Sequence, residues 1–237
     1  MKNMFFRFFW LLSTGCLLST GCSSLHKSSD PNVTVFESEQ GDSHIIQMGD
    51  SHAKSYLLRS DKRGLVIIDT GGHDNNPVLE YLASEGVSPE EVQKVFLTHA
   101  HGNHIGGIHL FPNADIYALE TEREALFEKG IVLDVGLSAN QVLSMGSSEL
   151  EVFAVPGHSM GNAAYRFDDL LIMGDSAISN ENGKIEPILS NADDPQLAHQ
   201  SLIQLKNELS SRQDEFAHML FSHSSSLPGI DALLQYE

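Results

Sequence analysis

The sequence predicts an α/β (α+β) domain in which two β-sheets carry helices on their outer faces. Short strand-like runs separated by Gly, Asp and Ser turns dominate residues 33–68, and strand and helix patterns are mixed over residues 77–237. Two packed sheets covered by helices are one of the few layer arrangements that such an order of elements allows. The 237 residues suit one such domain with a sizeable core, and we expect it to span residues 33–237.

The predicted strands are short apolar runs, and turn-forming residues separate many of them. We expect strands at residues 33–36, 44–47, 55–58, 65–68, 95–97, 115–118, 149–155, 162–167, 170–173 and 219–221. Helices are expected at residues 77–84, 120–129 and 195–210, with a short one at the C-terminus. Pro77 at the first position and Gly86 just past the end support the first helix, and apolar spacing supports the third.

Residues 1–21 have the form of a secretory signal peptide. Lys2 and Arg7 precede an uncharged, apolar or small stretch at residues 8–20, which is short for a membrane span. The following residues, up to 32, are polar and Ser-rich, so they are expected to form a flexible tether. The alternative is an ordinary cleaved signal or an uncleaved anchor.

The pentapeptide Leu-Ser-Thr-Gly-Cys at residues 18–22 resembles the lipobox of bacterial lipoproteins. The resemblance implies that Cys22 is acylated and becomes the first residue, and Ser23 after it favours the periplasmic face of the outer membrane. The same pentapeptide ends at Cys16, but cleavage there would leave a very short apolar region. Both cysteines lie in this segment, so the domain has neither a disulfide nor a thiolate ligand.

The formal charge of the chain is strongly negative. Loss of Lys2 and Arg7 with the signal takes it from −18 to −20. Nucleic acid and anionic membrane surfaces are therefore poor electrostatic partners, and membrane contact is expected only through the lipid on Cys22. The expected partner is a small-molecule substrate, and the sequence leaves the oligomeric state open.

Three histidines follow the strand predicted at residues 95–97. His99, His101 and His104 fall within six residues, and the small residues between them let their side chains converge. Neutral imidazole is the commonest nitrogen ligand for zinc and similar divalent metals. This spacing at a strand end predicts a metal site.

Four more polar residues follow apolar runs elsewhere in the chain: Asp69, His158, Asp175 and His223. Two packed sheets could bring all four to the edge that carries the three histidines. Metal sites are commonly assembled in this way, from distant residues held by rigid elements.

These motifs together resemble the metallo-β-lactamase superfamily. Thr-His-Ala-His-Gly-Asn-His-Ile-Gly-Gly at residues 98–107 is similar to its His-x-His-x-Asp-His signature, and matching elements lie at residues 68–71, 156–162, 173–175 and 221–223. The resemblance implies an αββα sandwich with a metal cleft at one edge. It also implies hydrolysis by a metal-activated water, without a protein nucleophile.

The resemblance also implies a ligand set. The first metal would be held by His99, His101 and His158, with Asp175 bridging to a second metal. That second site would be completed by His104, His223 and Asn103, and Asp69 would orient a ligand histidine. Zinc is the expected metal, with one or two ions per chain, and iron or manganese are alternatives.

Asn103 departs from the family pattern, which usually has Asp at this position. That aspartate binds the second metal and orients the attacking water, whereas an amide is neutral and accepts no proton at pH 7. We therefore expect weaker binding of the second metal, and either a one-metal site or slower hydrolysis. Asn103 and Asp69 are the candidate catalytic positions apart from the metal ligands.

Three features of the sequence argue against particular classes of enzyme within this superfamily. Only fourteen residues follow His223, which argues against hydroxyacylglutathione hydrolysis because those enzymes carry an appended helical domain. Asp175 argues against a dedicated β-lactamase, and the lack of a long insertion between His104 and His158 argues against the nuclease-like members. The remaining prediction is a hydrolase of a small ester, lactone, thioester or phosphoester.

Two alternatives remain open. One is a mononuclear iron oxygenase similar to persulfide dioxygenases, which would use His99, His158 and Asp175 alone. The other, prompted by Asn103, is a weakly active or non-catalytic metal-binding relic.

Overall fold

The computed structural model describes residues 25–27, 32–38, 44–49, 52–59, 65–72 and 77–237. The predicted signal peptide and Cys22 lie outside these residues. Within them, no helix is both long enough and apolar enough to cross a membrane.

The first sheet is built from consecutive strands, so its spatial order is its sequence order. Neighbouring strands are antiparallel from β1 to β5 and parallel from β5 to β8. The parallel pairs require crossover segments, which here contain the helices α1 (Pro77–Ser84), α2 (Gly102–Ile105) and α3 (Arg123–Glu128). The strands are β1 (Leu25–Lys27), β2 (Val33–Glu37), β3 (His44–Gly49), β4 (Lys54–Arg59), β5 (Leu65–Ile68), β6 (Val92–Phe96), β7 (Asp115–Leu119) and β8 (Val135–Leu137).

The second sheet comes from the rest of the chain, in the order β16-β15-β12-β11-β10-β9. Strands β12 and β15 are parallel, and α4 (Pro195–Leu209) lies between them in the sequence, followed at the end of the chain by α5 (Asp231–Leu234). The strands are β9 (Val142–Met145), β10 (Ser148–Ala154), β11 (Ala163–Phe167), β12 (Leu170–Ile172), β15 (His218–Leu220) and β16 (Leu227–Pro228), and a separate pair is β13 (Ile178–Ser179) and β14 (Ile185–Glu186).

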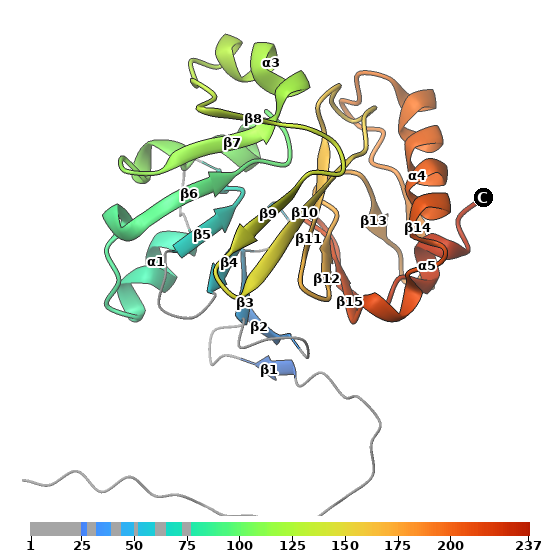
Figure 1. The fold of residues 1–237 in the computed structure, drawn as a ribbon, viewed down its shortest axis with the longest axis horizontal. Coiled ribbons are helices and arrows are strands. Elements are labelled where there is room, and N and C mark those ends of the chain that lie inside the picture. The colour runs from blue at the N-terminus through green and yellow to red at the C-terminus, as the bar shows by residue number, and fades with distance from the viewer. Residues whose placement is uncertain (1–24, 28–31, 39–43, 50–51, 60–64, 73–76) are drawn as a thin grey trace, which may run out of the picture.

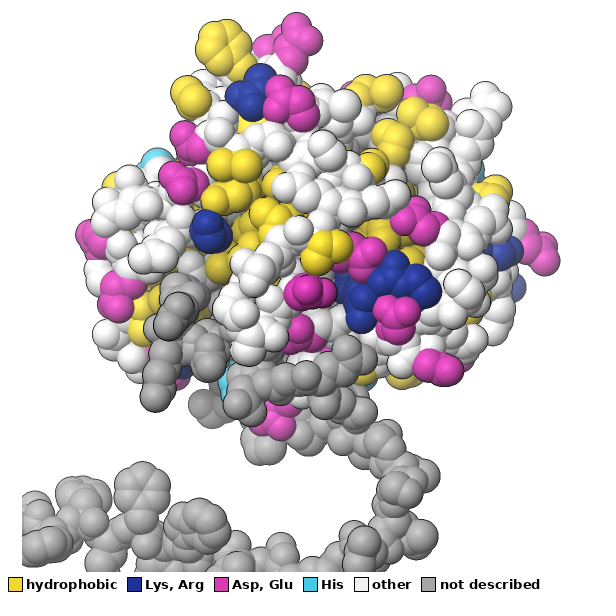
Figure 2. Space-filling model, in the orientation of Figure 1, with side chains coloured by type: hydrophobic (Ala, Val, Ile, Leu, Met, Phe, Trp, Pro, Cys, Tyr) yellow, Lys and Arg dark blue, Asp and Glu magenta, His cyan; other side chains and the backbone are white. Residues whose placement is uncertain are grey.

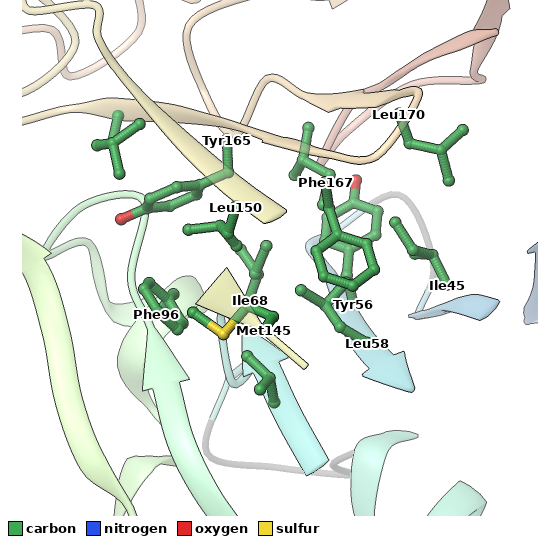
Figure 3. Close-up of a cluster of buried hydrophobic side chains, with 14 of the residues drawn as sticks. Ile45, Tyr56, Leu58, Ile68, Phe96, Met145, Leu150, Tyr165, Phe167 and Leu170 are labelled. Carbon is green, nitrogen blue, oxygen red and sulfur yellow. The ribbon is translucent and has the colours of Figure 1, made fainter. Parts of the chain in front are cut away.

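Three buried apolar clusters hold the layers together. The central cluster lies between the two sheets, where Tyr56, Ile68 and Phe96 of the first face Leu150 and Tyr165 of the second (Figure 3). A second cluster packs α1 against the first sheet, and a third packs α4 and α5 against the second sheet. At about 25 cal/mol per Å² of apolar surface, this burial is the main stabilising contribution. Figure 1 shows the resulting helix–sheet–sheet–helix order, which confirms the predicted sandwich.

Several parts of the chain differ from their predicted structure. Residues 25–27, expected in the tether, form β1 and pair antiparallel with β2. The helix expected at residues 120–129 starts as a 3-10 turn over Glu120–Glu122 and is α-helical only in α3. The short helix α2 and the strands β8, β9, β13, β14 and β16 were not predicted. The apolar run of β8 is interrupted by Gly136, where a Cβ would overlap the Glu120 carboxylate. Contact with Glu120 therefore requires glycine at residue 136, and the local strand signal is lost.

On the face in Figure 2, Lys and Arg side chains gather in one group that acidic side chains border, and are scattered elsewhere. One group of Arg side chains is neutralised within the fold, since Arg212 pairs with Glu151 at 2.7 Å and with Glu215 at 3.0 Å. These ion pairs leave the strongly negative formal charge of the chain unchanged.

Candidate metal centre

The three histidines of the first sheet lie where β6 ends. The chain leaves β6 at Phe96 and enters α2 at Gly102, so His99 and His101 occupy the connection and His104 lies on the helix. The amide of Thr70 donates to the carbonyl of His104 at 2.7 Å, which joins this segment to the end of β5. His99 and His104 are fully buried and His101 is half-buried.

The second sheet brings its polar residues to the same edge. Strands β10, β12 and β15 run in the same direction, because β11 is antiparallel to both β10 and β12 while β15 is parallel to β12. His158, Asp175 and His223 follow these three strands, so they meet at one end of the sheet.

One cluster contains His99, His101, His158 and Asp175, with ligand atoms all within 4.8 Å of one another. Nδ1 of His101 lies 3.0 Å from Nε2 of His158. Oδ2 of Asp175 lies 3.3 Å from Nε2 of His158 and 3.8 Å from Nε2 of His99. This is the set predicted for the first metal.

A second cluster contains His104, Asp175 and His223. Oδ1 of Asp175 lies 3.2 Å from Nε2 of His104 and 3.1 Å from Nε2 of His223. Asp175 belongs to both clusters, so its carboxylate lies where a bridging ligand would.

Asp69 orients His104 through its other ring nitrogen. Oδ2 of Asp69 lies 2.7 Å from Nδ1 of His104, and Thr98 donates to the same carboxylate from its amide at 2.8 Å and from its hydroxyl at 2.7 Å. Asp69 has a φ of 55°, a left-handed conformation that is uncommon outside glycine and that these hydrogen bonds hold in place. Asp69 is therefore a positioning group.

The donor atoms of these side chains fit a divalent metal. Nε2 of His99 is buried without a hydrogen-bond partner, since the Oδ2 of Asp175 is 3.8 Å away. Buried polar atoms normally have a partner, and imidazole nitrogen with carboxylate oxygen is a typical donor set for zinc. The residues thus suit a divalent metal of the predicted kind.

The protonation states support this interpretation. Burial lowers the pKa of His99 well below its ordinary value, and burial together with His158 lowers the pKa of His101, so both rings are neutral and able to bind metal. Burial raises the pKa of Asp175, but hydrogen bonds from His104, His158 and His223 outweigh this and hold it well below its usual range. Asp175 is therefore ionised.

His104 behaves differently from His99. Burial lowers its pKa, but the neighbouring Asp69 and Asp175 outweigh burial and raise the pKa of His104 to about 10. Metal binding at Nε2 of His104 would therefore release a proton, and metal affinity at the second cluster should increase with pH.

Asn103 lies beside the second cluster. It is half-buried, and its Nδ2 is 3.2 Å from the carbonyl of His52 and 3.4 Å from Nε2 of His223. Oxygen and nitrogen of an amide are distinguished by their partners, and rotating this amide by half a turn would present its oxygen to the cluster. Ligation by Asn103 stays a prediction.

Two buried charged residues near the site were not predicted. Glu122, with 1% of its surface exposed, accepts hydrogen bonds from Ala100, Ser159 and Gly161. Lys54 donates from Nζ to the carbonyls of Phe221, at 3.2 Å, and of Ser224, on either side of His223. Glu122 follows the strand predicted at residues 115–118, as the ligands follow their strands, but it belongs to no motif of the family. Lys54 precedes its strand, so no such signal marks it.

A two-sheet sandwich with one metal-binding edge defines the class of this protein, and comparison with known families names it. The model of the metallo-β-lactamase superfamily matches residues 48–212. The chain belongs to this superfamily, as the motifs around His99 and His158 led us to expect.

Several curated relatives are similar over part of their length. Metallo-β-lactamase domain-containing protein 1 of Mus musculus is 43% identical over 102 residues, which are 43% of this chain and 38% of that protein. A hydroxyacylglutathione hydrolase of Pectobacterium carotovorum is 33% identical over 138 residues, 55% of this chain and 49% of that protein. The chain thus matches less than half the length of these two relatives.

Solved structures show the same fold. A metallo-β-lactamase from Pontibacter korlensis superposes with a TM-score of 0.63 at 20% identity, over 90% of this chain and 96% of that one. A mutant flavo di-iron protein from Thermotoga maritima gives a TM-score of 0.64 at 14% identity, over 87% of this chain and 61% of that one. These identities support the fold and carry no information about substrate.

Proposed function

We propose that this protein is a metal-dependent hydrolase of a small ester, lactone, thioester or phosphoester. The observation that carries the proposal is the pair of clusters sharing Asp175, whose ligand atoms lie within 4.8 Å of one another in each cluster. We expect zinc, with His99, His101 and His158 holding the first ion and His104 and His223 holding the second. A bound divalent metal supplies an activated water and polarises the bond under attack.

The residues of the chain supply orientation. Asp69 holds the ring of His104, and the carbonyl of Ile188, 2.9 Å from Nδ1 of His158, holds the ring of His158. In each ring Nε2 is the nitrogen left to face Asp175. We expect Asn103, whose Nδ2 lies 3.4 Å from Nε2 of His223, to contact a water or substrate group at the second cluster.

The substrate panel should include hydroxyacylglutathione. The sequence argued against this substrate, but the relatives named hydroxyacylglutathione hydrolase, including one from Yersinia pestis that is 27% identical over 207 residues, support testing it. It is a thioester, which the proposed class already contains.

The first test is elemental analysis of the purified protein, followed by hydrolysis assays with one ester, lactone, thioester and phosphodiester. We expect one or two zinc ions per chain, and turnover that a chelator abolishes and zinc restores. Protein without metal, or turnover indifferent to the chelator, would contradict the proposal. One iron per chain without hydrolysis would favour the oxygenase alternative.

We also propose that the protein is a lipoprotein anchored through Cys22 at the periplasmic face of the outer membrane. The proposal rests on residues 18–22 of the sequence. Labelled palmitate should enter the wild type and Cys16→Ser but not Cys22→Ser. Labelling of Cys22→Ser equal to that of the wild type would contradict it.

A further inference from the structure

Glu122 is a buried carboxylate between two loops that carry metal ligands. Its Oε1 accepts a hydrogen bond from the amide of Ala100 at 2.8 Å, and its Oε2 accepts from the amide of Gly161 at 2.8 Å and from the hydroxyl of Ser159 at 3.0 Å. Ala100 separates His99 from His101, and the other two donors follow His158. One carboxylate therefore contacts the loops that hold all three histidines of the first cluster.

The approach of the second loop to Glu122 depends on the absence of a side chain at residue 161. A Cβ on Gly161 would lie 2.4 Å from Oε2 of Glu122 and 2.5 Å from its backbone nitrogen. Real Cβ atoms do not approach so closely, so only glycine lets this amide reach the carboxylate. The contact between Glu122 and the loop of His158 thus requires both the carboxylate at residue 122 and glycine at residue 161.

The two loops come from different sheets. The loop of His99 and His101 follows β6, and the loop of His158 follows β10. Nearer the strands they are joined by the amide of Ala163, which donates to the carbonyl of Thr98 at 2.9 Å. Further from the strands, Glu122 contacts both loops at residues that lie next to the ligand histidines in the sequence.

We propose that Glu122 is a positioning residue for the first metal: it sets the distance between the loop of His99 and His101 and the loop of His158 without itself binding metal. The inference rests on the metal centre of the proposed function. Residues that orient ligands without touching the metal commonly change metal affinity by about 10-fold to 100-fold when replaced.

Glu122→Gln is the sharpest test because it preserves shape and removes one acceptor. A carboxylate accepts at both oxygens, whereas an amide has one acceptor oxygen and an NH₂ group. The hydroxyl of Ser159 can rotate to accept from that NH₂, but the amides of Ala100 and Gly161 are both donors that cannot. One loop must therefore move away from residue 122.

The experiment is a zinc-binding isotherm of the full chain in metal buffers. His158→Ala and His223→Ala identify the steps that belong to the first and second clusters. We expect Glu122→Gln to weaken zinc binding at the first-cluster step, the one that His158→Ala weakens, by at least about tenfold. Zinc binding at the second-cluster step should weaken by less than about threefold. A purely structural defect would weaken both steps equally, and that result would overturn the inference.

Glu151→Gln is the matched control. Glu151 is also a carboxylate that joins separate segments, accepting from Arg212 at 2.9 and 2.7 Å, but it does not contact the metal loops. Its isotherm should match the wild type, and an equal loss in both Glu→Gln variants would overturn the inference. Should Glu122→Gln fail to fold, Ser159→Ala, which removes one donor of three, should weaken the first step by a few-fold.

Two negative results have different meanings. Wild-type protein that binds no zinc would contradict the proposed function and this inference with it. Zinc binding by the wild type that neither Glu122→Gln nor Ser159→Ala changes would contradict the inference alone.

Discussion

At the scale of single residues, the hydrogen bond at Nδ1 of His104 and of His158 determines which ring nitrogen can bind a metal. Nδ1 of His104 is bonded to Asp69 and Nδ1 of His158 to the carbonyl of Ile188, so both rings present Nε2. Such partners fix the direction of the ring and leave Nε2 as the nitrogen that can bind a metal. The centre is therefore oriented by the protein before a metal binds.

Asn103→Asp should raise the metal content toward two ions per chain and increase turnover. The new carboxylate would lie beside Nε2 of His223, where the amide nitrogen is now 3.4 Å away, and would add a charged oxygen to the second cluster. Elemental analysis and hydrolysis rates measure both effects. Asn113→Asp, which adds the same charge at an exposed position, is the control. No gain in either quantity would show that Asn103 does not limit the second site.

The double variant His99→Ala/His101→Ala should lose the first metal, at least one ion per chain. These rings supply two of the four donors of the first cluster, and the remaining His158 and Asp175 cannot complete a four-coordinate zinc site. Metal analysis after gel filtration measures the loss. Metal content equal to that of the wild type would refute the ligand assignment.

The clusters themselves were predictable because each ligand follows an apolar run and matches a family motif. His99 and His223 lie in separate clusters that share Asp175, and their roles as metal ligands stay predictions. Glu122 and Lys54 were not predictable, because their roles depend on backbone groups more than twenty residues away that only the folded chain brings near.

At the scale of elements, β4 supports the loop after β15. Lys54, at the start of β4, is 9% exposed and donates to the carbonyls of Phe221 and Ser224, which flank His223. A strand of the first sheet thus holds a ligand loop of the second.

Lys54→Met should lower the free energy of unfolding by about 1–3 kcal/mol at pH 7, because it leaves the buried carbonyl of Phe221 without its lysine donor. Burial lowers the pKa of Lys54 from 10.5 to about 8, so between these values the unfolded chain binds more protons than the folded one. The wild type should therefore gain stability relative to the variant as pH rises from 8 to 10.5. Urea unfolding at several pH values measures this gain, and a difference independent of pH would contradict the burial of a charged lysine.

Elements with local signals were predicted well. The helix over Pro77–Ser84 matches its predicted bounds, and β11 and β12 lie within one residue of theirs. Pro77 marks the helix start, and two polar residues separate the two strands. Strands β8 and β9 are short and lack alternation or clear turn signals, so their pairing with neighbours decides their structure.

For the whole molecule, removal of metal should lower the melting temperature. A ligand that binds only the folded state stabilises it by about 2.7 kcal/mol at a concentration 100 times its Kd. In a domain of this size that corresponds to roughly 5–10 °C. Calorimetry with and without chelator measures the shift, and identical melting curves for a protein shown to contain metal would contradict it.

The sheets are formed by successive parts of the chain, with β1–β8 ending at Leu137 and β9 starting at Val142. The part before this junction contributes three ligands, His99, His101 and His104, and the part after it contributes His158, Asp175 and His223. Neither part alone contains all the proposed ligands of the first or of the second metal ion. A metal held by the proposed ligands would therefore cross-link the two parts reversibly, and we expect a chain cut between residues 138 and 141 to behave as a heterodimer whose affinity depends on that metal.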